Sequence, residues 1–356
     1  MGVTAGNEPK CFEVDRRDLG VTRMVTAESG PPRDGDVLFD VERFGLSANN
    51  VTYAALGDRL RYWDLFPAEA GWGRIPVWGC LRVRSSRVPG IEADRRAFGL
   101  CPMASQVILR PGRSGAATFA EGSAHRSGLA GAYNVYAWAN SDTPGADDAL
   151  VVLRPVFWLS FTLDDFLAGS ERRDQPVIMT SASSKAALGL AYLLARRGVP
   201  VTGLTSAKHE PWVAGLGLYH RVLPYDHAEA LPAAGAVLID LAGNAALRDR
   251  VGYRAGRPGQ VVIGGYTHEG HSRDEHPAVD FFVPDRIRAL AGELGWPALE
   301  RRFGAALGDF ARDAASWLKV LCHPGLDTVE TVYRSVLGNA VGSPAEAHLI
   351  DLTGRS

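Results

Sequence analysis

The spacing of hydrophobic positions separates the chain into three regions, and the first is β-rich. Val37, Phe39 and Val41 fall on one face of a short apolar run, which is the two-residue period of a strand. Residues 77–83 and 104–109 form two further short apolar runs, and glycine and proline punctuate the segments between them. Many short strands joined by such turns predict a small barrel or sandwich.

The middle region alternates strand-like runs with helix-like segments. The strand-like runs are short and apolar, and they cover residues 176–180, 199–205, 221–224, 235–241 and 260–264. Helical spacing follows the first run at residues 188–197, which end in basic residues before Gly198, and a second helix is expected at 210–216. Strands that alternate with helices predict β-α-β units and a parallel sheet.

The last region is mainly helical. Apolar residues recur every three or four positions in residues 285–294, 297–307, 310–321 and 329–337, and residues 347–352 close the region as a strand. Together the three regions predict an α/β protein that combines a β-rich domain with a doubly wound parallel sheet.

One segment between the first two regions follows neither pattern. Residues 111–148 lack clear periodicity and are rich in glycine, alanine, serine and aspartate. A segment of this length and composition is either a functional loop or a mobile insertion.

Composition excludes several classes of protein. The chain has 356 residues, 46% of them hydrophobic and 22% charged, which suits a globular protein of about two domains and not a disordered chain. The net charge of −2 argues against nucleic acid or an anionic membrane as the main partner. No apolar run approaches the ~18 residues of a membrane span, and the N-terminal stretch lacks the apolar region of a secretory signal.

The four cysteines bear on the compartment and on metal binding. They are far apart in sequence and show no C-x-x-C pairing. This spacing argues against a zinc site built on cysteine and against a disulfide framework. We therefore expect a protein of the reducing cytoplasm.

The turn after the strand at 176–180 carries the most informative chemistry. Ser181, Ser183, Ser184, Lys185 and Ala186 are small or cationic residues placed between that strand and the helix that follows. Small residues let backbone N–H groups approach a pyrophosphate, and the helix N-terminus adds partial positive charge. The usual G-x-G-x-x-G is absent, so this dinucleotide site uses serine and alanine in place of glycine.

The end of the next strand indicates which dinucleotide is bound. A dehydrogenase that prefers NAD places an acid there for the ribose 2′-hydroxyl, whereas this chain has Thr205, Ser206 and Lys208. Hydroxyls and a cation suit a 2′-phosphate, which predicts NADPH. The alternative is that these residues only form a polar strand end and a helix cap.

The same segment resembles the cofactor domain of medium-chain dehydrogenase/reductases, especially the zinc-free quinone oxidoreductases. Residues 198–206 and 217–226 are similar to the second and third strands of that domain with their preceding glycines, and residues 236–243 and 259–265 resemble the two later strands that flank the nicotinamide. The resemblance implies that Leu241, Gly264, Gly265 and Tyr266 also contact the cofactor.

The resemblance extends to the rest of the chain. Residues 35–50 look like the opening strand and turn of the family's GroES-like catalytic domain, and residues 94–99 are similar to a later turn of that domain. Residues 333–337 and 349–352 resemble its return strand. The resemblance therefore implies the family's fold over most of the chain, with a GroES-like domain at residues 1–165 and 322–356 and a cofactor-binding domain at residues 166–321.

A narrower resemblance is to the domain-of-unknown-function 2855 family, which supplies no reaction to carry over. The segments that carry it are residues 48–53, 76–79, 133–136, 181–185 and 281–285.

Candidate catalytic residues follow the first long strand, where the family's active cleft begins. Tyr53 is the first choice for a proton donor or oxyanion stabiliser, and Asn49 and Asn50 lie beside it in sequence. Tyr53 is equally consistent with a core tyrosine, and Asn50 with a helix cap.

Four further residues are candidates for contact with the substrate. Tyr133 and Asn134 lie in the aperiodic segment and could cover the substrate, and Trp78 and Tyr136 could line its pocket. The alternatives are an anchored surface loop for the first pair and ordinary packing for Trp78.

We expect no catalytic metal. The family's zinc ligands would fall near residues 76–79, which read Pro-Val-Trp-Gly. Residues 267–276 contain three histidines and three carboxylates but lack helical His-Glu-x-x-His spacing, so a solvated polar loop is expected there.

These observations lead to one expected function and one alternative. The expected function is that of an NADPH-dependent, zinc-free reductase that transfers a hydride to an enone, quinone or carbonyl of a small molecule. The alternative is a non-redox enzyme, such as a lyase or isomerase, or a small-molecule binding protein on the same fold. A homodimer is also expected, with residues 261–263 as the sheet edge through which two copies pair.

Overall fold

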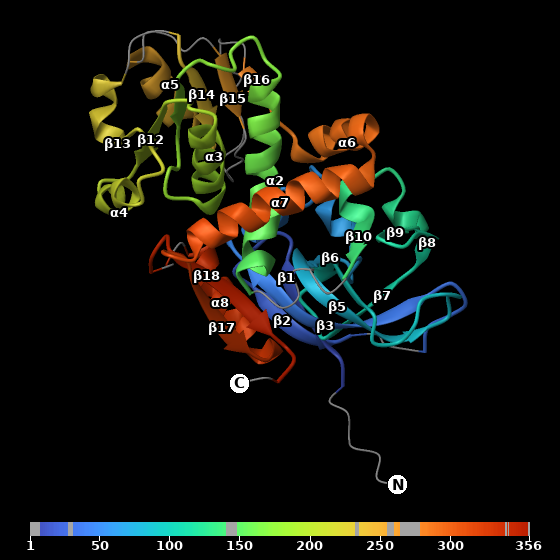
Figure 1. The fold of residues 1–356 in the computed structure, drawn as a ribbon. Helices are drawn as coiled ribbons and strands as arrows, with labels where there is room; N and C mark the ends of the chain where they lie inside the picture. The colour runs from blue at the N-terminus through green and yellow to red at the C-terminus, as the bar shows by residue number, and fades with distance from the viewer. Residues whose placement is uncertain are drawn as a thin grey trace. The chain divides into compact units, whose positions relative to one another are not determined.

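The computed structural model resolves two compact units that are described separately here. The residues that it describes are 8–27, 31–139, 148–231, 235–254, 260–263, 278–338, 340 and 342–354. One unit comprises Met1–Val152 with Leu318–Ser356, and the other comprises Leu153–Trp317 (Figure 1). The sequence placed these divisions later, after residues 165 and 321, which fall inside a helix and a strand of the structure.

The first unit is built on a large, mainly antiparallel sheet. In spatial order its described strands are β17 (Lys319–Pro324), β18 (Glu346–Asp351), β3 (Val37–Leu46), β5 (Pro76–Ser86), β6 (Arg96–Pro102), β10 (Val135–Trp138), β9 (Thr118–Glu121) and β8 (Pro111–Ser114), and β7 (Gln106–Leu109) also pairs with β3. A smaller sheet has the order β2 (Thr22–Thr26), β1 (Lys10–Asp15), β4 (Trp72–Gly73). The expected β-rich first region is confirmed.

Helices of the first unit are short and cover the core of the large sheet. They are α1 (Ala48–Ala55), α8 (Val329–Leu337) and the 3-10 turns η1 (Tyr62–Asp64), η2 (Ala124–Arg126), η3 (Gly131–Asn134) and η5 (Leu326–Thr328). The core includes Phe39 and Phe44 of β3, Trp63 of η1 and Tyr333 of α8, all of them almost fully buried. Val329–Leu337 is the helix that the sequence predicted.

Residues 111–138 differ from the expected aperiodic insertion. They form β8, β9, η2, η3 and β10, and β10 joins the large sheet by pairing with β6. The strands are only four residues long, too short for a clear period. Their buried aromatic residues nevertheless stack in the core, with the rings of Phe119 and Tyr136 4.7 Å apart.

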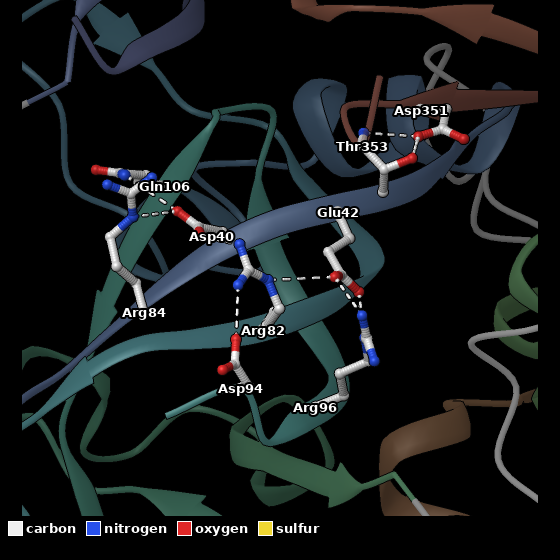
Figure 2. A network of polar contacts seen from close by, with 9 residues as sticks. All are labelled: Asp40, Glu42, Arg82, Arg84, Asp94, Arg96, Gln106, Asp351 and Thr353. Carbon is white, nitrogen blue, oxygen red and sulfur yellow. Dashed lines mark hydrogen bonds and ion pairs between the residues drawn. The ribbon is translucent and has the colours of Figure 1, made fainter. Parts of the chain in front are cut away.

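A network of ion pairs links β3, β5 and β6 on the polar face of the large sheet (Figure 2). Asp40 and Glu42 alternate along β3 with buried apolar residues, so both carboxylates face away from the core. Arg82 on β5 reaches Asp40 at 2.8 Å, and Arg96 on β6 reaches Glu42 at 2.8 Å. Because these pairs are partly exposed, each contributes at most about 1 kcal/mol, and they help mainly to define strand register.

Three of the four cysteines of the first unit lie in its interior. Cys11, Cys80 and Cys101 are buried, Cys322 is exposed on β17, and none of the four forms a disulfide. Burial raises the pKa of both Cys11 and Cys80 to about 12. The absence of a disulfide framework agrees with the sequence.

The second unit is a doubly wound parallel sheet. In spatial order its described strands are β13 (Arg221–Pro224), β12 (Val201–Thr205), β11 (Val177–Met179), β14 (Val237–Asp240), β15 (Gln260–Ile263) and β16 (Ala278–Asp280), and each pairs in parallel with its neighbour. In chain order these are strands 3-2-1-4-5-6, the arrangement of dinucleotide-binding folds. The predicted parallel sheet is confirmed.

Helices pack on the sheet of the second unit and bury it on both faces. They are α2 (Asp148–Ala168), α3 (Lys185–Arg196), α4 (Glu210–Gly215), α5 (Ala245–Arg254), α6 (Val283–Leu294) and α7 (Trp296–Ala314), with the 3-10 turn η4 (Tyr225–Ala230). Val177 and Met179 of β11 pack in one apolar cluster with α3, whereas Ile178 between them packs in another with Val251 of α5. Burial on both faces explains why these strands read as continuous apolar runs.

One helix was not predicted, and one helical prediction is wrong. The sequence analysis placed no element over α2, because buried residues lie all around this helix and leave no polar stripe, and because it contains Pro155, a residue type that usually ends helices. The sequence also predicted one helix at 310–321, whereas α7 ends at Ala314 and β17 begins at Lys319.

The expected dimer edge is also wrong. Residues 261–263 belong to β15, which pairs with β14 on one side and with β16 on the other. Its backbone is therefore not available to pair with a second copy of the chain. The β-branched run belongs to an interior strand and not to an edge. Within the described residues, no helix combines the length and the apolar character needed to cross a membrane.

Close packing in the second unit gives a testable expectation at Gly203 of β12. A Cβ at this position would lie 2.8 Å from the Ala182 Cβ and 2.9 Å from the Tyr219 ring. We expect Gly203→Ala to lower the free energy of unfolding by about 1–3 kcal/mol, as overpacking does. Urea unfolding measures it.

A matched control is Gly215→Ala in α4, where an added Cβ meets nothing within 4 Å. Alanine favours helix over glycine by about 1 kcal/mol, so this variant should be at least as stable as the parent. Equal stabilities of the two variants would contradict the close approach at Gly203.

Candidate active site

The turn that follows β11 has the geometry of a phosphate-binding turn. Ser184 is the N-cap of α3, and its Oγ accepts a hydrogen bond from the Ala187 N–H at 3.3 Å. Ser181 adopts a φ of +55°, in the left-handed region that glycine normally occupies. The N-terminus of this 12-residue helix supplies partial positive charge at the turn.

Neighbouring strands and side chains hold this turn in place. The Ala182 N–H donates to the Leu204 carbonyl at 3.0 Å, and the Ala182 carbonyl accepts from the Tyr219 hydroxyl at 2.8 Å. The Ser181 N–H donates to the Tyr225 hydroxyl at 3.0 Å. Residues 181 and 182 are therefore fixed by protein contacts before any ligand binds.

The residues expected to bind the 2′-phosphate differ in their exposure to solvent. Thr205 is almost fully buried within β12, whereas Ser206 is half-buried and Lys208 is exposed. The sequence missed His209, whose Nδ1 lies 3.5 Å from the Ser183 Oγ. Burial and the nearby Lys208 lower the pKa of His209, so its imidazole is neutral at pH 7.

A buried polar network, also missed by the sequence, joins the ends of β11 and β14. The Thr180 hydroxyl donates to the Asp240 carboxylate at 2.7 Å, and Arg248 donates to the other oxygen of that carboxylate at 2.9 Å. Leu241 follows Asp240 and is half-buried. Gly264, Gly265 and Tyr266, the other expected cofactor contacts near the nicotinamide, lie outside the described residues.

In the first unit, Tyr53 lies beside three of the other predicted residues, Asn49, Trp78 and Tyr133. The Trp78 indole N–H points to the Tyr53 hydroxyl at 3.5 Å, and the Asn49 side chain also hydrogen-bonds this hydroxyl. Burial raises the pKa of Tyr53, and the two hydrogen bonds oppose that shift in part. The phenol is therefore protonated at neutral pH and suits a proton donor.

Tyr62 completes the cluster, and the sequence did not single it out. Its ring centroid lies 4.5 Å from that of Tyr53 and 5.5 Å from that of Tyr133. The hydroxyls of Tyr62 and Tyr133 are 2.8 Å apart and hydrogen-bonded. The structure thus brings together Tyr53, Tyr133, Trp78 and Asn49, with Tyr62 as an added member.

Asn50 caps the N-terminus of α1. Its Oδ1 accepts from the Ser47 N–H at 2.8 Å, which closes a capping box at the start of α1. Its Nδ2 donates to the Pro76 carbonyl at 3.0 Å, and the side chain is buried. These contacts satisfy the alternative of a helix cap, and Asn50 is not carried into the candidate site.

Tyr136 and Asn134 also differ from their expected roles. Tyr136 is fully buried, and its hydroxyl donates to the Leu100 carbonyl at 2.7 Å and accepts from Arg126 at 3.1 Å. It therefore belongs to the core and not to a substrate pocket. Asn134 is half-buried and donates to the Arg126 carbonyl at 3.4 Å, which anchors η3 beside the tyrosine cluster.

Arg126 ties the two turns of the cluster together. Its Nε donates to the Leu65 carbonyl at 3.0 Å, just after η1, and its backbone carbonyl holds Asn134 of η3. The guanidinium is almost fully buried and lies 3.7 Å from the equally buried Glu121 carboxylate. Tyr62 and Tyr133 are thus placed by a buried ion pair.

The residues of the second unit fit a dinucleotide. The strand order is that of dinucleotide-binding folds, and the small residues of the turn and the N-terminus of α3 place backbone N–H groups and partial positive charge where a pyrophosphate would bind. No group of three metal-ligating side chains occurs among the described residues. The histidine-rich residues 267–276 lie outside them.

Solved structures share this architecture along nearly the whole chain. The CurA protein of Vibrio vulnificus, in complex with NADPH, is 12% identical over 97% of this chain and 100% of that chain, with a TM-score of 0.61. The CurK enoyl reductase is 13% identical (97% and 99% covered, TM-score 0.61). A mycobacterial quinone oxidoreductase is 14% identical (97% and 100% covered, TM-score 0.57).

These likenesses define the class by its fold. The chain has the medium-chain dehydrogenase/reductase fold, a GroES-like unit with a Rossmann unit, as its sequence resemblance implied. A family model described as "Protein of unknown function (DUF2855)" matches residues 44–342, and the chain belongs to this family. No curated protein matches it significantly.

The buried ion pair of Arg126 generates a stability prediction. We expect Arg126→Met to lower the free energy of unfolding by about 3–5 kcal/mol, because the Glu121 carboxylate would stay buried without its cation. Denaturant unfolding followed by tryptophan fluorescence measures this change.

The control is Arg96→Met in the same unit. Arg96 pairs with Glu42 at the surface, and its side chain is 48% exposed, so its loss should cost about 0–1 kcal/mol. If both variants lost the same stability, Arg126 would not be the anchor described here.

Proposed function

We propose that this protein is an NADPH-dependent, zinc-free reductase that acts on an enone, quinone or carbonyl of a small organic molecule. The observation that carries the proposal is the turn from Ser181 to Ser184, set at the first strand of a 3-2-1-4-5-6 parallel sheet. The similarity to CurA in its NADPH complex, to the CurK enoyl reductase and to the mycobacterial quinone oxidoreductase supports it.

The second unit would bind the dinucleotide. The N-terminus of α3 and the small residues of the turn would hold the pyrophosphate, and Ser206 and Lys208 would hold the 2′-phosphate. His209 is neutral at pH 7 and could donate or accept beside them. When bound, the reduced nicotinamide supplies a hydride.

The first unit would handle the acceptor. Tyr53 keeps its proton at neutral pH and could give it to the enolate or alkoxide that develops on the acceptor. Trp78 and Asn49 orient the hydroxyl that would donate. The aromatic rings around it favour a planar, apolar acceptor.

A second candidate is a non-redox enzyme or small-molecule binding protein on the same fold. The observation that favours it is the contact between the Ser181 N–H and the Tyr225 hydroxyl, which already satisfies one amide of the turn. Serine and alanine also replace the glycines through which phosphates are usually approached.

Titration of the purified protein with each nicotinamide separates the two candidates. We expect NADPH to bind more tightly than NADH, because Thr205 ends β12 and Ser206 follows it, without an acid at the strand end, and Lys208 offers a cation to the 2′-phosphate. Lys208→Ala should weaken NADPH binding about five- to tenfold, as the loss of an exposed charged contact does. Nucleotide fluorescence measures both dissociation constants.

NADH serves as the control within the same variant, since it lacks the 2′-phosphate and its affinity should not change. A variant that lost affinity for both nucleotides equally would contradict the role of Lys208. Failure of the parent to bind either nucleotide would favour the non-redox candidate.

Tyr53→Phe tests the proton donor. We expect turnover to fall by about 10²-fold or more, as for loss of a general acid, while the NADPH dissociation constant stays within about twofold. Steady-state kinetics on an enone or quinone, together with the nucleotide titration, provide the two readouts.

Tyr333→Phe is the matched control, because Tyr333 is also a buried tyrosine of the first unit and its hydroxyl donates to the Leu19 carbonyl at 2.9 Å. Its loss should cost stability and leave turnover unchanged. Equal turnover of Tyr53→Phe and the parent would remove Tyr53 from the mechanism.

A further inference from the structure

The strand order of the second unit marks the place where a ligand crevice forms. Chain order runs outward in opposite directions from β11 and β14, which are neighbours, so the switch point of the sheet lies between them. In open parallel sheets, ligands bind outside the carboxyl ends of the strands at this point. The residues at those two ends are Thr180, which follows β11, and Asp240, which ends β14.

Thr180 links the two strand ends through one hydroxyl. Its Oγ donates to the Asp240 Oδ1 at 2.7 Å and accepts from the N–H groups of Leu241 and Ala242 at 2.9 and 3.0 Å. Its own N–H donates to the Ile239 carbonyl at 3.0 Å. The residue that opens the phosphate turn therefore also fixes the loop after β14.

Asp240 fixes the same loop from the other side. Its Oδ1 accepts from the N–H groups of Ala242 and Gly243 at 3.0 and 3.1 Å. Its Oδ2 accepts from Arg248 of α5 at 2.9 Å. The three consecutive amides of residues 241–243 thus all point into the network.

The network is buried, and removing its charged groups from water costs desolvation free energy. Asp240 is fully buried, and only 6% of the Arg248 side chain is exposed. A buried ion pair seldom adds net stability over apolar residues of the same volume, so stability alone gives a weak account of this pair. Thr180 Oγ and Asp240 Oδ1 accept the backbone amides of residues 241–243, and Arg248 pairs with the remaining oxygen of Asp240.

We propose that Thr180, Asp240 and Arg248 are positioning residues that hold the turn 181–184 and the loop 241–243 as one unit and thereby set the affinity for the dinucleotide. This inference rests on the proposed function for its ligand. Its structural part, the coupling of the two loops, stands on the hydrogen bonds themselves and can be measured without a ligand.

Thr180→Val is the sharpest variant, because it keeps the shape of the side chain and removes only the shared hydroxyl. Asp240→Asn and Arg248→Met remove the two charges in turn. The matched control is Arg154→Met, which breaks another ion pair of the same unit, the 2.6 Å contact between the buried Arg154 and the half-buried Glu300 that joins α2 to α7.

Two measurements are made on each full-length variant. Hydrogen exchange read by mass spectrometry follows the peptides that contain residues 180–184 and 241–243, without ligand. Fluorescence titration gives the NADPH dissociation constant, and thermal unfolding shows whether each variant is folded.

We expect Thr180→Val to speed exchange in both peptides and to raise the NADPH dissociation constant about tenfold, which is about 1.4 kcal/mol. Arg154→Met should lower the unfolding temperature without either effect. Asp240→Asn and Arg248→Met should also speed exchange in the two peptides and raise the NADPH dissociation constant. If either of these variants fails to fold, the test of the proposal rests on Thr180→Val.

Unchanged exchange at residues 241–243 in Thr180→Val overturns the proposal, whatever the nucleotide titration gives. The same changes in Arg154→Met also overturn it, because they would then reflect general stability. If the parent binds no nicotinamide nucleotide, the proposed function fails and the dinucleotide role fails with it, while coupled exchange would still assign the three residues to positioning of the two loops.

Discussion

Backbone N–H groups just beyond the end of a strand lose their partners in the sheet and need other hydrogen-bond acceptors. In this protein, buried side chains provide those acceptors. At the switch point of the parallel sheet, Thr180 and Asp240 accept the amides of the loop that follows β14. In the first unit, Glu121 accepts the amides of Arg110 and Ser123, and Arg126 donates to the Leu65 carbonyl. The loops that carry candidate chemistry are therefore held by charges that are themselves paired and out of water, so their shape is set before a ligand arrives.

Periodicity predicted the elements whose burial is one-sided or whose length is ordinary. α3, α6, α8 and the parallel strands β11 to β15 fall where the sequence placed them, because apolar spacing and glycine stops mark them, whereas the three-residue β16 was not predicted. α2 was missed since its surface is apolar nearly all round, and residues 111–138 were missed since strands of four residues show no period. Residues 261–263 were misplaced because an apolar run does not say whether a strand is central or at an edge.

The candidate site was predicted in part. Tyr53, Asn49, Trp78 and Tyr133 come together, but Tyr62 follows the left-handed Arg61 in a short 3-10 turn with no pattern to flag it. A signal for Asp240 was present, since a carboxylate ends an otherwise apolar strand and the cation Arg248 follows eight residues later, in α5. Its meaning depends on Thr180, 60 residues away in sequence, and only the folded sheet brings these groups into contact.

The distribution of thiols has a practical consequence for labelling. Cys11, Cys80 and Cys101 are buried, and burial raises the pKa of each, so the reactive thiolate is scarce and shielded there. Cys322 alone among the four is exposed, on β17 of the first unit. A maleimide dye would therefore mark one known strand of the native protein, and a spin label or fluorophore could be attached there without removing any cysteine by mutation.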